Sequence, residues 1–228
     1  MSPRRRAFLA GSRASLPLLL GILPFGVVTG VALVASGIAP TAAVLMSLLV
    51  YAGAAMLAAA QLLGVATPAG IVVLSALFIN LRFVMYSASM RPHLGRLPRR
   101  WKLLIGYLLT DNPYALAIVR FTEHPGEPAK GAYFLGAAAP VWLTWQLGVL
   151  GGVLAGAGLP ASWKLEFAAP LAFIAMSVPL LGDRAMVAAA LAAAVTVVLA
   201  HPLPLHLGVA LAALAGIAAG VASERRTA

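Results

Sequence analysis

Two opposite charges lie deep inside apolar runs of this sequence, and their chemistry stands out from everything around them. Arg82 is near the middle of Pro68–His93, which is long and apolar enough to cross a bilayer as one helix. Asp111 is at the midpoint of a second run, Trp101–Phe121. A charge at the centre of a spanning helix costs about 2.5–3.5 kcal/mol on insertion scales, so each needs a partner or a watery cavity. We therefore expect Arg82 and Asp111 to be neighbours in a polar site inside the membrane.

Polar side chains follow both charges at helical spacing. Residues three, four or seven apart share one face of a helix, and two such faces can be read from the sequence. The first carries Ser75, Arg82, Tyr86, Ser89 and His93, with Asn80 one small step away; the second carries Tyr107, Thr110, Asp111 and Tyr114. Pro113 would free the Leu109 carbonyl from its helical hydrogen bond, which predicts a helix break beside Asp111.

These groups suit a zwitterion that carries an apolar side chain. Arg82 can bind a carboxylate and Asp111 can bind an ammonium group, within an otherwise apolar wall. Two simpler interpretations remain open: Arg82 only joins two helices, and Asp111 only neutralises Arg82.

Composition indicates a polytopic helical membrane protein. The chain is 62% apolar and 10% charged, whereas soluble domains are nearer half apolar and a quarter charged. No polar block is long enough to fold separately, so we expect one all-α membrane domain over residues 1–228. The net charge of +10 gathers in residues 1–15, in Arg91–Lys102 and at the C-terminus. These clusters indicate cytoplasmic segments that face anionic lipid, with residues 1–15 as a basic cytoplasmic N-terminus, and not nucleic-acid binding.

The charge distribution conflicts with a simple count of spans. If the first three runs all cross, residues 1–15 and the Arg91–Lys102 loop lie on opposite sides, although both are basic. We expect the second run, Thr41–Leu63, to be a broken or re-entrant element around Gly53, which would then line a central site. With the later runs, this gives about seven crossings. The balanced charges of Thr122–Gly131 predict an outside loop, and glycines 148, 152 and 156 predict a close helix contact.

The sequence argues against several other chemistries. It has no cysteine, no His-Glu-x-x-His motif and no carboxylate cluster suited to a metal, so we expect no metal site and no cofactor. Asp111 is the only deep acid, and an intramembrane protease would need a second catalytic partner at that depth. We therefore expect that the chain is not an enzyme.

Several blocks resemble the AzlC/YgaZ family of branched-chain amino acid permeases. They are Leu23-Pro24-Phe25-Gly26, Leu48-Leu49-Val50-Tyr51-Ala52-Gly53-Ala54, Asn80-Leu81-Arg82 with Tyr86-Ser87-Ala88-Ser89, and Tyr107-Leu108-Leu109-Thr110-Asp111. The resemblance implies a multi-pass bacterial inner-membrane exporter of valine-like amino acids. It also implies a small second membrane subunit of the AzlD/YgaH type as partner. The sequence departs from the family pattern at Met56, Phe83 and Asn112, where the family commonly has Gln, His and Glu.

The candidate substrate-binding residues follow from these arguments. They are Arg82, Asp111, Asn80, Tyr86, Thr110, Tyr114 and Gly53. Two other functions remain as alternatives, a channel or passive pore for small solutes and a non-transporting subunit of a membrane complex.

Overall fold

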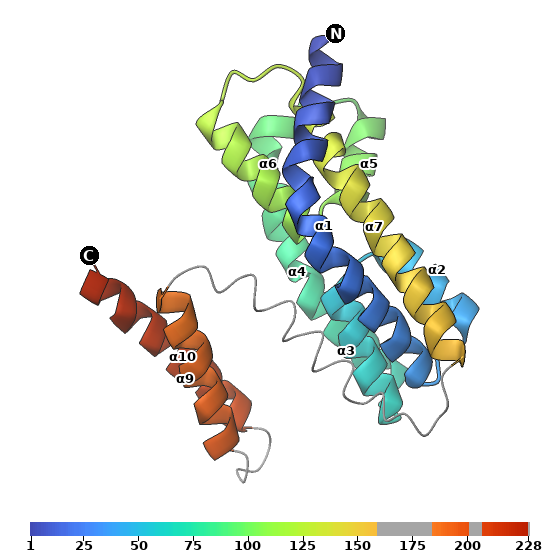
Figure 1. Ribbon diagram of the computed structural model, residues 1–228, viewed down its shortest axis with the longest axis vertical. Helices are drawn as coiled ribbons and strands as arrows, with labels where there is room; N and C mark the ends of the chain where they lie inside the picture. Colours follow the sequence, from blue (N-terminus) through green and yellow to red (C-terminus); the bar gives the residue numbers. More distant parts are fainter. Residues whose placement is uncertain (159–183, 201–206, 228) are drawn as a thin grey trace. The chain divides into compact units, whose positions relative to one another are not determined.

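The computed structural model describes residues 1–158, 184–200 and 207–227, and every regular element in these ranges is an α-helix (Figure 1). The chain divides into two compact units, Met1–Phe173 and Ile174–Ala228, which we describe separately. The expectation of an all-helical protein is confirmed. The expectation of one domain over residues 1–228 stays a prediction.

Three helices of the first unit are long and apolar enough to cross a membrane: α1 (Pro3–Ala35), α4 (Ala69–Leu94) and α7 (Lys130–Gly158). Four shorter helices complete the described part of this unit: α2 (Pro40–Val50), α3 (Gly53–Gly64), α5 (Arg99–Leu108) and α6 (Asp111–Glu123). The sixth predicted run, 163–181, lies outside the described residues. The count of seven crossings therefore stays a prediction.

Helices α1 and α7 run side by side and form the centre of the first unit (Figure 1). Glycines allow this close approach. A Cβ added to Gly152 would collide with the Val27 backbone, and one added to Gly30 would collide with the Val149 carbonyl. Gly148 and Gly156 also face α1, so the predicted contact through this row of small residues is confirmed.

The second predicted run is broken, as the charge distribution indicated. Helix α2 ends at Val50, Tyr51 is left-handed with φ 44°, and Ala52 is extended before α3 starts at Gly53. Gly64, the last residue of α3, lies near Ser36, the residue that follows α1. The two half-helices therefore form a hairpin, α2–α3, that starts and ends near the same end of α1.

The fourth predicted run is also broken, and the predicted helix break beside Asp111 is confirmed. The single run Trp101–Phe121 did not anticipate that its two halves turn back. Helix α5 ends at Leu108 and α6 starts at Asp111, with Leu109 and the extended Thr110 between them. Pro113 occupies the first turn of α6, where its missing N–H leaves no intrahelical bond unmade. Helices α5 and α6 form a second hairpin.

The end of the unit that holds the start of α1 also holds both ends of hairpin α5–α6. One pocket is lined by Ser2, by Leu97 next to α5 and by Ala129 after α6. The predicted placement of residues 1–15 and the Arg91–Lys102 loop at one end is therefore supported by the geometry. The prediction that Thr122–Gly131 lies at the opposite end was wrong, because hairpin α5–α6 turns back and returns this loop to the same end.

The second unit contains α9 (Arg184–Leu199) and α10 (Leu207–Thr227) among its described residues. Gly216 faces Ala189 and Ala193, whereas Gly220 faces Ala185 and Ala189. The residue numbers rise along one helix as they fall along the other, so the pair is antiparallel and packs through small side chains.

Candidate functional site

The tips of the two hairpins meet at a small cavity in the first unit. Its volume is about 60 Å³. Tyr51, Ala52 and Gly53 come from the break in α2–α3, and Thr110, Asp111 and Asn112 come from the break in α5–α6; α4 adds Arg82 and Phe83, α1 adds Ile22 and Phe25, and α7 adds Val141 and Trp145. Four of the predicted site residues, Gly53, Arg82, Thr110 and Asp111, therefore line one cavity.

The two deep charges are partners, as predicted. Arg82 Nη1 lies 3.2 Å from Asp111 Oδ1, and the two side chains are 29% and 45% exposed. The guanidinium also lies 5.2 Å from the centre of the Phe83 ring. The Nε atom of Arg82 is buried and has no hydrogen-bond partner among the described residues. The pair is thus only partly bonded, and Arg82 keeps a free donor beside the cavity.

Tyr86 supports the carboxylate of this pair. Its hydroxyl donates a 2.8 Å hydrogen bond to Asp111 Oδ1, the oxygen that also faces Arg82. Its ring stacks on Tyr114 at a centroid distance of 4.2 Å, and the Tyr114 hydroxyl donates to Ser89 Oγ at 3.2 Å. The predicted polar face of α4 therefore faces α6. Tyr114 does not line the cavity but holds Tyr86 in place.

Asn80, like Tyr86 and Tyr114, does not line the cavity. Its side-chain oxygen is buried without a hydrogen-bond partner among the described residues. Its position one helical step from the Arg82 face explains this placement. No interaction of the described part of the chain joins Asn80 to the ion pair.

The two breaks present helix N-termini to the cavity. Helix α3 starts at Gly53 after Ala52, and α6 starts at Asp111 after Thr110; neither preceding residue caps its helix with a side chain. The first amide N–H groups of a helix have no intrahelical acceptor and carry partial positive charge. Together with Arg82, they make this cavity a place where a carboxylate can be bound.

The tip of hairpin α2–α3 is fixed by side chains of α5 and α7. Ser47 Oγ donates to Gln146 Oε1 at 2.8 Å and accepts from Trp145 Nε1 at 3.0 Å. The Leu48 carbonyl, one of those left free by the break, accepts a 2.7 Å hydrogen bond from the Tyr107 hydroxyl. A broken helix at membrane depth needs such partners, because lipid supplies none.

Gly53 lies against aromatic side chains. A Cβ at this position would lie 2.6 Å from Phe25 Cε1 and 2.7 Å from Trp145 Cη2, closer than atoms of this kind approach. A larger residue would push both rings, which themselves line the cavity. We expected Gly53 to lie where backbone approaches backbone or substrate, but its close neighbours are side chains and not backbone.

The sequence argument missed the aromatic part of the lining: Phe25, Tyr51, Phe83 and Trp145. Phe25 and Tyr51 lie in the blocks that carried the family resemblance, but nothing in their spacing pointed to a shared cavity. Tyr51 is only 5% exposed, and its hydroxyl has no partner that meets standard hydrogen-bond geometry within the described part. The break at Tyr51–Ala52 was the available signal, because residues at a helix break line the same cavity as the break itself.

The site contains groups for binding and none arranged for metal chemistry. Among residues 1–158, 184–200 and 207–227, no three His, Asp or Glu side chains converge as metal ligands. One cation, one anion, two helix N-termini and aromatic walls can hold the two charged groups of a zwitterion. A volume of about 60 Å³ suits a few waters but not a whole amino acid, because pockets for small ligands are typically about 300 Å³ or larger.

Comparison with known proteins gives this arrangement a family. Residues 17–159 match the AzlC protein family. The chain belongs to the AzlC family. The match begins at residue 17 within α1 and extends through α7, so it contains both hairpins and the ion pair. Two of the three departures from the family pattern, Phe83 and Asn112, line the cavity, whereas Met56 is fully buried in α3.

Several curated membrane proteins are similar to this AzlC family member. The inner membrane protein YgaZ of Escherichia coli is 26% identical over 69% of this chain and 64% of its own length. Uncharacterized membrane proteins of Haemophilus influenzae and Archaeoglobus fulgidus are 30% and 28% identical, over 70% and 92% of this chain and 65% and 92% of their own lengths. The chain thus spans less than two thirds of the first two relatives. No solved structure matches this chain.

Proposed function

We propose that this AzlC family member is a transporter that exports branched-chain or similar apolar amino acids across the bacterial inner membrane. The observation that carries the proposal is the meeting of two helix breaks and an incompletely bonded ion pair at one cavity. Broken helices at the centre of a membrane protein are a way in which transporters bind charged substrates.

The cavity offers a separate partner to each part of such a substrate. The amide groups that begin α3 and α6, with the free donor of Arg82, would bind the carboxylate. Asp111 would bind the ammonium group in exchange for part of its contact with Arg82. The rings of Phe25, Phe83 and Trp145 would contact an apolar side chain, which favours valine-like substrates over polar ones.

Binding requires a wider state than the one described, because the cavity is too small for an amino acid. A groove of about 590 Å³ lies between α4 and α5, and Phe83 lines both this groove and the cavity. The groove runs from the Phe83 side to Arg91 and Lys102. These two residues lie near the basic end, which is the end of the first unit that holds the start of α1 and both ends of hairpin α5–α6. We infer that a shift of the Phe83 ring would join the groove to the cavity and open a route from that end.

Saturable counterflow in liposomes is the test of this proposal. The purified chain would be reconstituted with and without a small AzlD/YgaH-type subunit, which is the partner that the family resemblance implies. Vesicles loaded with unlabelled valine should accumulate labelled valine transiently, and excess leucine should compete whereas excess lysine should not. Conductance without saturation would instead support a passive pore. Neither activity, with the subunit present, would favour a non-transporting role.

A further inference from the structure

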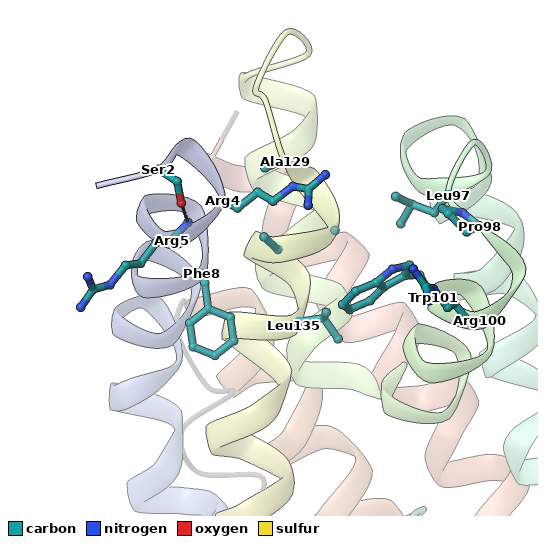
Figure 2. A pocket seen from close by; sticks show the side chains of 12 residues that line it. Ser2, Arg4, Arg5, Phe8, Leu97, Pro98, Arg100, Trp101, Ala129 and Leu135 are labelled. Carbon is teal, nitrogen blue, oxygen red and sulfur yellow. Dashed lines mark hydrogen bonds between the residues drawn. The ribbon is translucent and has the colours of Figure 1, made fainter.

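A second and much larger pocket lies at the basic end of the first unit, away from the central cavity. Its volume is about 750 Å³, and it is formed where α1, α5 and α7 begin (Figure 2). Arg4 of α1 extends toward Ala129, and the Trp101 indole of α5 points toward Leu135 of α7. Arg5 also belongs to the lining, but its guanidinium points outward.

The lining is divided into a charged part and an apolar part. Arg4 and Arg100 supply positive charge, and Phe8, Trp101 and Leu135 supply apolar surface. Phe8 and Trp101 are 39% and 38% exposed, so two large rings are left uncovered. This combination fits a molecule that has a negative head and an apolar body.

None of the described residues that line this pocket carries negative charge. Glu123 and Glu127 are the carboxylates of the nearby segment Thr122–Gly131. Glu127 accepts hydrogen bonds of 2.8 and 2.9 Å from Arg120, and no ion pair among the described residues joins Glu123 to Arg4 or Arg100. Arg4 and Arg100 therefore have no acidic partner among the described residues. The residues that precede three helices, Ser2, Pro98 and Ala129, also line the pocket, and the partial charges of these N-termini add to the positive potential.

We propose that this pocket binds an anionic phospholipid, with the phosphate between Arg4 and Arg100 and the glycerol and upper acyl chain against Phe8, Trp101 and Leu135. Basic pockets between membrane helices on the cytoplasmic side are suited to anionic headgroups, and tryptophan favours the level of the headgroups. A free phosphate would leave the apolar half of the pocket unused. The bound lipid would join the starts of α1, α5 and α7 and so hold hairpin α5–α6 against α1.

Binding can be measured by native mass spectrometry of the detergent-purified full chain titrated with phosphatidylglycerol or phosphatidylcholine. We expect preferential binding of phosphatidylglycerol. Because each arginine near an anionic surface contributes about fivefold in affinity, the double variant Arg4→Gln/Arg100→Gln should bind about 25-fold more weakly. Trp101→Ala should also weaken binding although it removes no charge. The matched control is Arg96→Gln/Arg99→Gln, which removes two charges from the same region but none from the pocket lining.

Two results would overturn the proposal. An equal loss of phosphatidylglycerol binding in Arg4→Gln/Arg100→Gln and in the control would mean diffuse attraction and no built site. Competition by glycerol phosphate as strong as that by the intact lipid would mean that a small free anion is the ligand. Arg4→Lys/Arg100→Lys, which keeps the charge, should retain most of the binding and would show that a loss in the Gln variant is not a folding defect.

Discussion

The described part of the first unit, residues 1–158, contains two arginine–carboxylate pairs that differ in how completely they are bonded. Arg120 donates from Nε and Nη2 to the two carboxylate oxygens of Glu127, at 2.8 and 2.9 Å, near the end of hairpin α5–α6. Arg82 makes one contact of 3.2 Å with Asp111, and its Nε has no partner among the described residues. Both pairs have the same chemical groups, but they line different spaces. The second pair lines the central cavity where the two helix breaks meet. Arg120 and Glu127 line a separate pocket of about 320 Å³ beside the start of α1.

This difference separates a structural role from a binding role. In a bidentate pair, two arginine N–H groups and both carboxylate oxygens bind each other. Such a pair fixes the loop that follows α6. A pair held by one contact keeps hydrogen-bonding capacity for a third group. It can exchange partners with little change in free energy. We therefore expect loss of transport from changes at Arg82 and Asp111, and only small losses of stability from changes at Arg120 and Glu127.

The largest effects should come from removing the central charges. Arg82→Leu or Asp111→Leu should abolish counterflow and lower membrane abundance, because each strands the other charge at a cost of about 3 kcal/mol. The double variant should recover abundance but not transport, since the substrate has lost both partners. Fluorescence size-exclusion chromatography and liposome counterflow would measure the two quantities.

The matched control is the double variant Arg120→Leu/Glu127→Leu, which removes the same chemical groups outside the cavity. It should export at close to the normal rate. The account fails if the central double variant exports normally, which would make the pair structural. If that variant is no more abundant than either single one, Arg82 and Asp111 are not energetic partners.

A change of shape beside the central pair should have a comparable effect on transport and a smaller one on folding. Gly53→Val would displace Phe25 and Trp145, because an added Cβ would already lie 2.6 and 2.7 Å from their rings. We expect folded protein in the membrane with less than about a tenth of normal export, since overpacking of this kind costs about 1–3 kcal/mol. Gly21→Val is the control, because nothing lies within 4 Å of an added Cβ there. Equal export by both variants would show that the Gly53 contacts are not needed for transport.

The hydroxyl groups around Asp111 should have graded effects. Tyr86→Phe removes a 2.8 Å hydrogen bond to the carboxylate, and bonds to charged groups contribute about 1.5–3 kcal/mol. We expect the concentration of valine for half-maximal counterflow to rise about tenfold or more. Tyr114→Phe removes only a 3.2 Å bond to Ser89, so its effect should be a few-fold at most. The reverse order would place substrate contact at Tyr114 and not at Asp111.

The smallest effect concerns the other pair and depends on pH. The hydrogen bonds and the charge of Arg120 hold the pKa of the Glu127 carboxyl below its ordinary value. A carboxyl with a lowered pKa in the folded state stabilises that state at neutral pH, and this contribution is lost as the pH falls through the lowered pKa.

Glu127→Gln should therefore lower the thermal stability of the detergent-purified protein slightly at pH 7, by about 1 kcal/mol or less because the pair is partly exposed. The difference from the unmodified chain should vanish under acidic conditions, and valine counterflow at pH 7 should be unchanged. A difference that persists or grows as the pH falls would contradict the assigned role of this pair.

The sequence was sufficient to predict the parts of the site that depart from the pattern expected of an apolar membrane helix. Arg82 and Asp111 violate the apolar pattern, so their pairing could be predicted from the cost of a lone charge in lipid. The break before Gly53 could be predicted because two basic segments, 1–15 and Arg91–Lys102, needed the same side. The polar face of α4, with Tyr86 at its centre, followed from helical spacing alone.

The second hairpin could not be predicted in the same way. A run of about twenty apolar residues, such as Trp101–Phe121, fits one crossing helix as well as it fits two half-helices that turn back. The loop that follows it, Thr122–Gly131, has balanced charge and so gave no positive-inside signal. The aromatic lining at Phe25 and Trp145 depends on how α1 and α7 pack against the hairpins, which is a tertiary property with no local pattern.

The most direct test of the central claim is substrate protection of a single cysteine between the hairpin tips. The chain has no cysteine, so Thr110→Cys in the cavity and Thr122→Cys near the exposed end of α6 would each be the only labelled position. We predict that valine slows the reaction of Thr110→Cys with a small methanethiosulfonate reagent, half-maximally at the concentration that half-saturates counterflow, and leaves Thr122→Cys unaffected. A Thr110→Cys variant that still exports valine, yet reacts at the same rate with and without it, would contradict the claim that substrate binds between the two helix breaks.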